Sequence, residues 1–171
     1  MPLNVTLLES RLRQYVLNDA REVGSYSPDL VQDGAMAFAE AYAGYAKDAQ
    51  SCGGLINVTV LPAQQAVLAN LLAAGLRTAR DPAAGSNAYA NALTAFWANP
   101  LLWTPVPPAL PATLVVPGVT PVLLSQLAAF SAPTLEASAA GLALIYDAWT
   151  RTVAVTHPLP GPPFVCALPI F

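Results

Sequence analysis

Charged side chains are scarce in this sequence. Lys, Arg, Asp and Glu make up 10% of the 171 residues, whereas an average soluble domain contains about 25%. The shortage is uneven, because fourteen of the charged residues fall within residues 1–81, and only Glu136, Asp147 and Arg151 fall within residues 82–171. Surface charge normally keeps a protein soluble, and a domain of this size leaves much of its surface exposed. We therefore expect other polypeptides to cover part of the uncharged half.

Histidine and cysteine are also rare, which narrows the possible chemistry. The single histidine, His157, precedes a proline in an apolar segment, and Cys52 and Cys166 are far apart in the sequence. These residues do not have the spacing of zinc ligands, and a Ser–His or Cys–His mechanism would have to use His157. We predict no enzymatic activity, no catalytic residue, no cofactor and no metal site. Whether the two cysteines are free or bridged stays open.

Uninterrupted apolar runs and basic clusters are missing as well. The most apolar stretch, residues 109–130, contains Pro111, Pro117 and Pro121, and proline interrupts a helix. Residues 1–20 mix charged and apolar side chains, unlike a signal peptide. The net charge of −3 comes without a basic patch. We therefore expect no membrane span, no signal peptide and no direct contact with nucleic acid.

Apolar residues recur at helical spacing along much of the chain, which predicts a mainly helical domain. Ser27, Ser86 or Asn87, Thr120 and Thr134 are candidate N-caps, and the Asp81-Pro82 pair is expected to end a helix. The expected helices cover residues 3–23, 28–50, 62–80, 87–98, 120–130 and 134–151.

Two alternating, β-branched segments predict a small β-sheet. Residues 55–61 and 152–156 have this pattern, and we expect them to pair with each other. Residues 112–116 have the character of an edge strand. The expected fold class is mainly α with a small β-sheet. Residues 1–156 form a single helical domain in this interpretation, and residues 157–171 form an extended C-terminal arm.

Proline is abundant in two segments that we expect to be extended. Residues 100–117 contain six prolines and residues 157–171 contain five. A proline-rich segment is already extended, so it loses less entropy than a flexible one when it docks. Apolar anchors in these arms are the candidate partner-binding residues: Leu101, Leu102, Trp103, Leu110, Leu114, Phe164, Val165, Leu168, Ile170 and Phe171.

Aromatic residues on the expected helices allow an alternative function. Tyr42, Tyr45, Phe96 and Trp97 could line the pocket of a small-ligand-binding helical domain. Packing of these rings in the core is the more common outcome. The isolated charges Asp147 and Arg151 are four residues apart, so we expect them to form an ion pair on one helix face.

The alanine-rich texture resembles a known class of proteins. The segments AFAEAYAGYAKDAQS, ANALTAFWANP and AAGLALIYDAWTRTVAVT are similar in pattern to small structural proteins of tailed-bacteriophage virions. The resemblance covers roughly residues 35–156 and implies a non-enzymatic subunit of the head, neck or tail. It implies a homo-oligomer within a larger complex, with other virion proteins and copies of itself as partners. Assembly would take place in the host cytoplasm.

Removal of residues 158–171 tests the expected role of the C-terminal arm. The truncated chain should fold, because its helices are intact, but it should fail to assemble. Circular dichroism checks the first outcome, and the mass of the assembled species checks the second. Normal assembly of the truncated chain would contradict the role of the arm.

Overall fold

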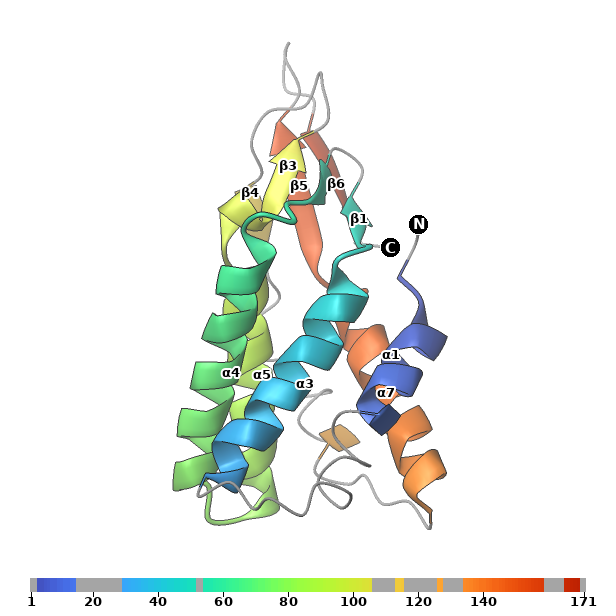
Figure 1. Ribbon diagram of the computed structural model, residues 1–171. Coiled ribbons are helices and arrows are strands. Elements are labelled where there is room, and N and C mark those ends of the chain that lie inside the picture. The colour runs from blue at the N-terminus through green and yellow to red at the C-terminus, as the bar shows by residue number, and fades with distance from the viewer. Residues whose placement is uncertain are drawn as a thin grey trace.

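Helices and a group of short strands make up the structure, a computed structural model that describes residues 3–14, 29–51, 54–105, 113–115, 126–127, 134–158 and 165–169. The helices run lengthwise and the strands gather at one end (Figure 1). The described α-helices are α1 (Val5–Arg11), α3 (Leu30–Ala46), α4 (Leu61–Thr78), α5 (Pro82–Trp97) and α7 (Leu135–Thr150). The expectation of a mainly helical fold with a small β component is confirmed.

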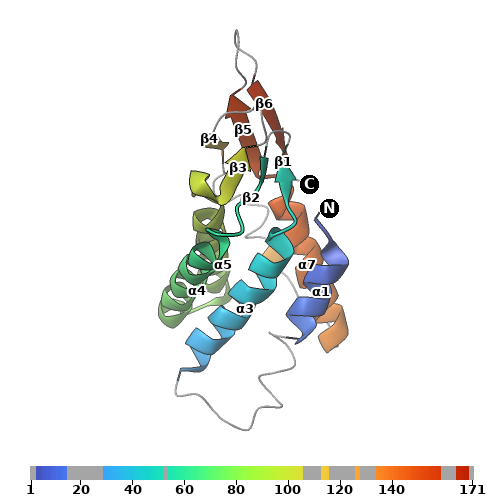
Figure 2. The same ribbon diagram turned by 45° about the horizontal axis from the view of Figure 1, so that its top comes forward.

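Two small antiparallel sheets lie at the end of the helices (Figure 2). The first sheet has the order β1-β2-β3 and the second has the order β4-β5-β6. A 3-10 helix, η2 (Pro100–Leu102), leads into β3. The strands are β1 (Gln50–Ser51), β2 (Gly54–Ile56), β3 (Trp103–Pro105), β4 (Thr113–Val115), β5 (Ala154–Pro158) and β6 (Val165–Pro169).

Side-chain caps begin four of the helices and correct two sequence predictions. Asp29, and not Ser27, caps α3, where its carboxylate accepts the backbone N–H of Gln32. Asp81 caps α5 by accepting the backbone N–H of Ala84, and Pro82 occupies the first turn. The preceding helix, α4, ends at Thr78, just before this pair as expected, but the prediction that Ser86 or Asn87 starts the next helix is wrong. Proline suits the first turn of a helix because the N–H it lacks has no helical partner there.

The remaining helix predictions have mixed outcomes. Thr134 caps α7 as expected, with its hydroxyl accepting the N–H of Ala137. The helix expected over residues 3–23 is described as α1 only to Arg11, followed by a wider turn through residue 14. Residues 15–23 lie outside the described residues. Of the helix expected over residues 120–130, only residues 126–127 are described, and they are helical.

The strand expected over residues 55–61 is shorter, and its expected pairing is wrong. β2 ends at Ile56 because Asn57 starts a turn, in which its side-chain oxygen accepts both the backbone N–H and the hydroxyl of Thr59. β2 pairs with β1 and β3, whereas β5, the strand expected at residues 152–156, pairs with β4 and β6. The two predicted strands thus belong to different sheets. The expected edge strand at residues 112–116 is β4.

The C-terminal segment takes part in the chain's own second sheet. In β6, Val165 lies opposite Pro158 and Pro169 lies opposite Ala154 of β5. β5 occupies the centre of this sheet, so β4 and β6 form its two edges. The described residues of the expected arm therefore belong to this chain's own sheet: residues 157–158 end the central strand β5, and residues 165–169 form the edge strand β6.

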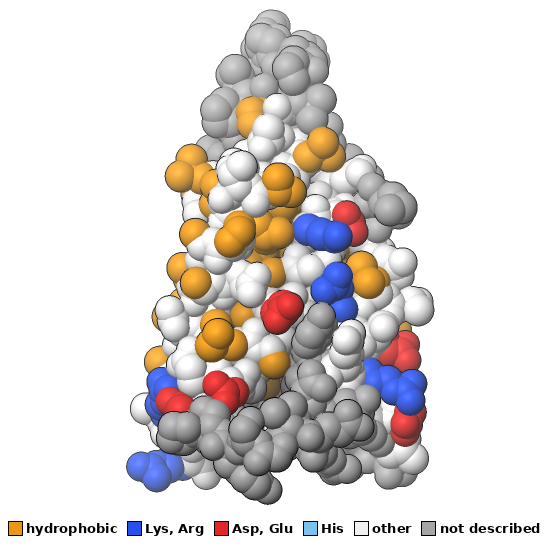
Figure 3. Space-filling model, viewed as in Figure 1, with side chains coloured by type: hydrophobic (Ala, Val, Ile, Leu, Met, Phe, Trp, Pro, Cys, Tyr) orange, Lys and Arg blue, Asp and Glu red, His pale blue; other side chains and the backbone are white. Residues whose placement is uncertain are grey.

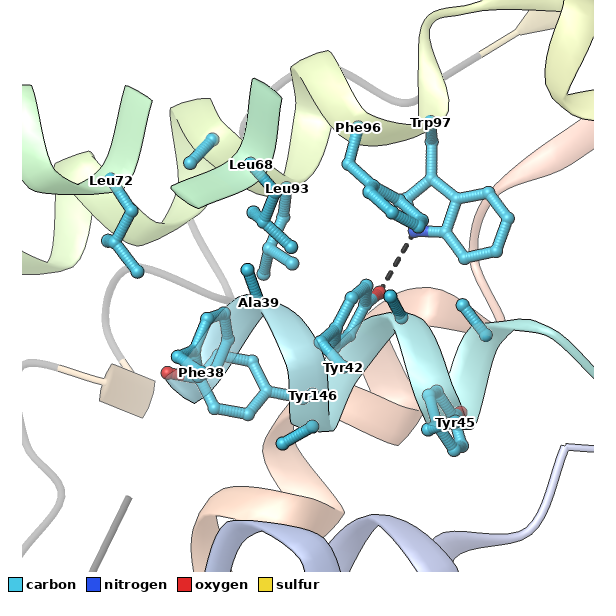
Figure 4. Packing of buried hydrophobic residues seen from close by; sticks show 14 of the residues in the cluster. Phe38, Ala39, Tyr42, Tyr45, Leu68, Leu72, Leu93, Phe96, Trp97 and Tyr146 are labelled. Carbon is cyan, nitrogen blue, oxygen red and sulfur yellow. Dashed lines mark hydrogen bonds between the residues drawn. The ribbon is translucent and has the colours of Figure 1, made fainter. Parts of the chain in front are cut away.

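Helix α3 lies at the centre of the hydrophobic core. Phe38, Ala39 and Tyr42 of α3 face Leu68 and Leu72 of α4 and the aromatic end of α5, while Tyr146 approaches from α7 (Figure 4). Many of the buried α3 residues are alanines. Because alanine has a small side chain, neighbouring helices can approach α3 closely, and their large aromatic rings pack directly against its backbone.

Gly75 provides a test of the close approach between α4 and α5. A Cβ atom on Gly75 would lie 2.6 Å from the Cβ atom of Ala88, whereas a Cβ atom on Gly34 of α3 would have no neighbour within 4 Å. Gly75→Ala should lower the free energy of unfolding, because overpacking costs about 1–3 kcal/mol and the gain in helix propensity returns roughly 1 kcal/mol. Gly34→Ala, the matched control, should raise it by up to about 1 kcal/mol. Urea denaturation measures both, and a stabilised Gly75→Ala variant would refute the close packing.

Candidate functional site

The four aromatic residues of the proposed ligand pocket lie inside the packed core. Tyr42, Tyr45, Phe96 and Trp97 are each 0% exposed. The ring of Tyr42 lies edge-on to Phe96 at a centroid distance of 5.5 Å, and Phe96 lies edge-on to Trp97 at 5.1 Å. The interpretation of these rings as core packing is confirmed. The small-ligand alternative would therefore need another site.

A chain of hydrogen bonds runs through this core and connects three helices. Trp97 Nε1 donates to Tyr42 Oη over 2.9 Å (Figure 4). Thr150 Oγ1 donates to the backbone carbonyl of Tyr146, so its one proton is used and Tyr42 Oη donates to Thr150 Oγ1 over 2.5 Å. Each polar group in the chain thus has a partner, as burial requires. The arrangement fixes α3, α5 and α7 relative to one another.

Asp147 holds a second group of polar contacts at the edge of the core. Its two oxygens accept Tyr45 Oη at 2.5 Å and Arg151 Nε at 2.8 Å, and its side chain is only 13% exposed. Arg151 Nη2 also donates to the backbone carbonyl of Leu3. The predicted ion pair between Asp147 and Arg151 is confirmed. Its wider role is to join α7, α3 and the segment before α1.

Burial changes the acid–base properties of the core tyrosines. Loss of solvent raises the pKa of Tyr42 and Tyr45 well above the ordinary value of about 10, and the Asp147 carboxylate adds to the effect at both. Burial likewise raises the pKa of Tyr146. A phenol with such a pKa stays protonated near neutral pH. These hydroxyls therefore act as structural hydrogen-bond groups.

The described residues do not assemble a metal centre. No group of three His, Cys, Asp or Glu side chains within the described ranges is placed to hold a metal ion. His157 lies in β5 and Cys166 in β6, where the structure describes only the backbone, and Cys52 lies outside the described residues. The predictions of no cofactor and no metal remain predictions.

The structure separates the candidate partner-binding residues into three groups. Leu101 is 67% exposed, whereas Leu102 and Trp103 are 0% and 3% exposed and pack in the chain's own core. Among these three, partner contact remains an expectation for Leu101 alone. The backbones of Leu114, Val165 and Leu168 lie in the edge strands β4 and β6. The remaining candidates lie outside the described residues: Leu110, Phe164, Ile170 and Phe171.

Two exposed apolar residues near Leu101 were not among the candidates. Leu55 in β2 is 46% exposed and Val58 in the following turn is 66% exposed. Asn57, between them, donates its side-chain amide to the carbonyl of Leu101 and its backbone N–H to the carbonyl of Leu102. We call Leu55, Val58 and Leu101 the sheet-end residues. Alternation within residues 55–61 could have indicated that Leu55 points outward, since Ile56 is buried.

Charge is segregated in space as well as in sequence. Residues 49–76 and 82–135 contain no charged side chain, so β1 to β4 and η2 are uncharged. In Figure 3 the described upper part of the surface shows apolar and uncharged side chains, whereas the coloured charges lie lower, from the level of β1 down over the helices. None of the described helices has both the length and the apolarity that crossing a bilayer requires.

Comparison with known proteins does not assign the chain to a family. No family model matches the sequence, and no significant match was found among curated proteins or solved structures. Its function must therefore be argued from its own residues.

Alkaline pH tests the burial of the tyrosine hydroxyls. Unfolded tyrosines lose their protons near pH 10, whereas Tyr42, Tyr45 and Tyr146 keep theirs in the fold. Stability is thus fully present below pH 10 and falls as the pH rises above it, by about 1.4 kcal/mol per pH unit for each such group.

Tyr42→Phe removes one of these groups, so the free energy of unfolding should fall with pH less steeply above pH 10, by about 1.4 kcal/mol per pH unit. It should also cost about 1–3 kcal/mol at pH 7, because Trp97 Nε1 loses its acceptor. Urea denaturation between pH 8 and 11 measures both effects. An unchanged slope in the variant would mean that the Tyr42 hydroxyl titrates normally.

Proposed function

We propose that this protein is a non-enzymatic structural subunit of a tailed-bacteriophage virion, in the head, neck or tail. It assembles in the host cytoplasm with copies of itself and with other virion proteins. The observation that carries the proposal is the uncharged end of the molecule, where the sheet-end residues expose apolar side chains. The alanine-rich texture of residues 35–156 supports the choice of a virion protein.

The sheet-end residues have the composition of the centre of a protein interface. Such centres are depleted in charge and contain exposed apolar side chains that become buried on binding. Leu101, Val58 and Leu55 are 67%, 66% and 46% exposed. Full burial of one such side chain contributes about 1.5–3 kcal/mol. A partner that covers this end gains that energy without having to desolvate an ion.

The backbone of β3 favours contact through side chains at this end. In the register of the first sheet, Leu55 and Thr104 face each other, and Asn57 bonds to Leu102. Because antiparallel bonds alternate, the backbone groups of Trp103 and Pro105 point to the outer edge. The N–H of Trp103 donates to the carbonyl of Pro100, and Pro105 has no N–H. The outer edge of β3 therefore offers no free N–H to an added strand.

The second sheet is the place where the extended-arm part of the proposal applies. β6 is an edge strand, and the proline-rich segment around it is the proposed C-terminal arm. An edge strand can pair with a strand from a neighbouring molecule. The partner-binding roles of Val165 and Leu168 belong to this part of the proposal.

Leu101→Lys tests the uncharged end as an assembly surface. A lysine there would have to be buried or would keep the partner away, so the apparent association constant should fall at least about tenfold, or about 1.4 kcal/mol. The fold should be unaffected, because Leu101 is exposed. Analytical ultracentrifugation of the purified chain, and incorporation into purified particles, measure the effect.

Leu30→Lys is the matched control for this experiment. Leu30 is 62% exposed at the start of α3, beside the charged residues Asp29 and Asp33. The Leu30→Lys variant should assemble as the unmodified chain does. Equal assembly of both variants, or a chain that stays monomeric at high concentration and is absent from particles, would overturn the proposal.

A further inference from the structure

A groove of about 420 Å³ runs along the surface between α3 and α4. It lies on helices and is separate from the sheet-end residues. Its floor and walls are mainly apolar: Met36 and Ala37 come from α3, and Pro62, Ala66 and Ala69 come from α4. Met36 is 55% exposed, so its flexible side chain is available to a partner.

Polar contacts close the groove near the start of α3. Gln32 donates its amide to Asn70 Oδ1 at 3.5 Å, and Arg77 donates to Gln32 Oε1 at 3.2 Å. Arg77 also forms an ion pair with Asp29, so its charge is compensated. The groove is therefore bounded at this end by side chains that already have partners within the chain.

Carboxylates line only one side of the groove. Asp33 and Glu40, both exposed, belong to α3 and lie on either side of Met36 in the sequence. They are seven residues apart, which is two helical turns or about 10 Å. The residues from α4 that line the groove are uncharged, and no lysine or arginine among the described residues lines it. In Figure 3 acidic and apolar side chains lie next to each other over this face.

We propose that this groove binds an amphipathic helix of a partner protein that carries two basic side chains about two turns apart. Its apolar face would cover Met36 and the alanines of α4, and its basic residues would meet Asp33 and Glu40. Helices commonly dock in such grooves through residues spaced three, four and seven apart. The alanines in the floor allow the close approach that helix packing needs.

A second copy of this chain is a poorer occupant. Within the described residues, Arg13, Arg77 and Arg151 are held in ion pairs with acidic residues of the same chain, and Arg11 packs over Gly44 of α3. The two other described basic residues, Lys47 and Arg80, are exposed but follow different helices, α3 and α4. No described helix presents two basic residues seven apart. Charge complementarity thus points to a different protein. The inference does not depend on the proposed role in a virion.

A selection experiment identifies what the groove prefers. The probe is a yeast-displayed library of 18-residue helical peptides with randomised faces, selected with the purified full-length chain. Counter-selection uses Met36→Lys, which places a cation in the groove at an exposed position. Peptides that prefer the unmodified chain should be enriched in Lys or Arg seven residues apart, on either side of apolar positions.

Variants of the rim then test the charge pairing. The Asp33→Asn and Glu40→Gln double variant should bind a selected peptide at least tenfold more weakly. A double variant with Asp33→Lys and Glu40→Lys should recover binding when the two basic peptide residues are replaced by Glu. Fluorescence anisotropy measures the dissociation constants.

Matched controls separate the groove from general effects of charge. Leu71→Lys lies on α4 at a site that is 45% exposed and does not line the groove. The Glu9→Gln and Asp48→Asn double variant removes the same charge elsewhere. Both control variants should bind the selected peptide as tightly as the unmodified chain does. The Leu101→Lys variant should also bind the peptide normally, even if this substitution prevents assembly.

Three results would overturn the inference. The library could give no peptide that distinguishes the unmodified chain from Met36→Lys. The selected peptides could lack paired basic residues. The rim variants could bind as tightly as the unmodified chain.

Discussion

The hydrogen bond from the Tyr42 hydroxyl to Thr150 joins α3 to α7 within the core. Tyr42 on α3 accepts from Trp97 on α5 and donates to Thr150 on α7, all without exposure to solvent. A buried polar group without a partner costs free energy, so the packing of the three helices is most stable when the chain of bonds is complete. The position of α3 in turn fixes the groove that it forms with α4.

Alanine is the second condition on which this arrangement depends. The alanines of α3 leave room for large rings from α5 and α7, and the contact between Gly75 and Ala88 brings α4 against α5. Close packing of this kind uses little charge. The remaining charged residues therefore serve specific tasks, such as the cap at Asp29 and the ion pair of Asp147 with Arg151.

The two proposed surfaces have different physical characters. The sheet-end residues are uncharged and would contact a partner through burial of apolar area alone, which suits permanent assembly. The groove between α3 and α4 combines an apolar floor with a carboxylate rim, which selects for charge as well as shape. A subunit with both surfaces can contact two kinds of neighbour at once.

The sequence by itself determined the helical class, the cap at Thr134 and the ion pair of Asp147 with Arg151. These features depend on residues within about four positions of each other, where the geometry of the helix decides the outcome. The start of α5 was also encoded locally by Asp81 and Pro82, but the same pair can end a helix or begin one.

Only the tertiary structure decided strand pairing and exposure. Pairing of β2 with β3, and of β4 with β5, joins residues about 40 or more positions apart in the sequence, which alternation alone cannot match. The neighbours Leu101 and Leu102 have the same side chain, yet one is exposed and the other buried. Their difference depends on which way the chain turns as η2 leads into β3. The groove likewise exists only because packing places the acidic side of α3 beside α4.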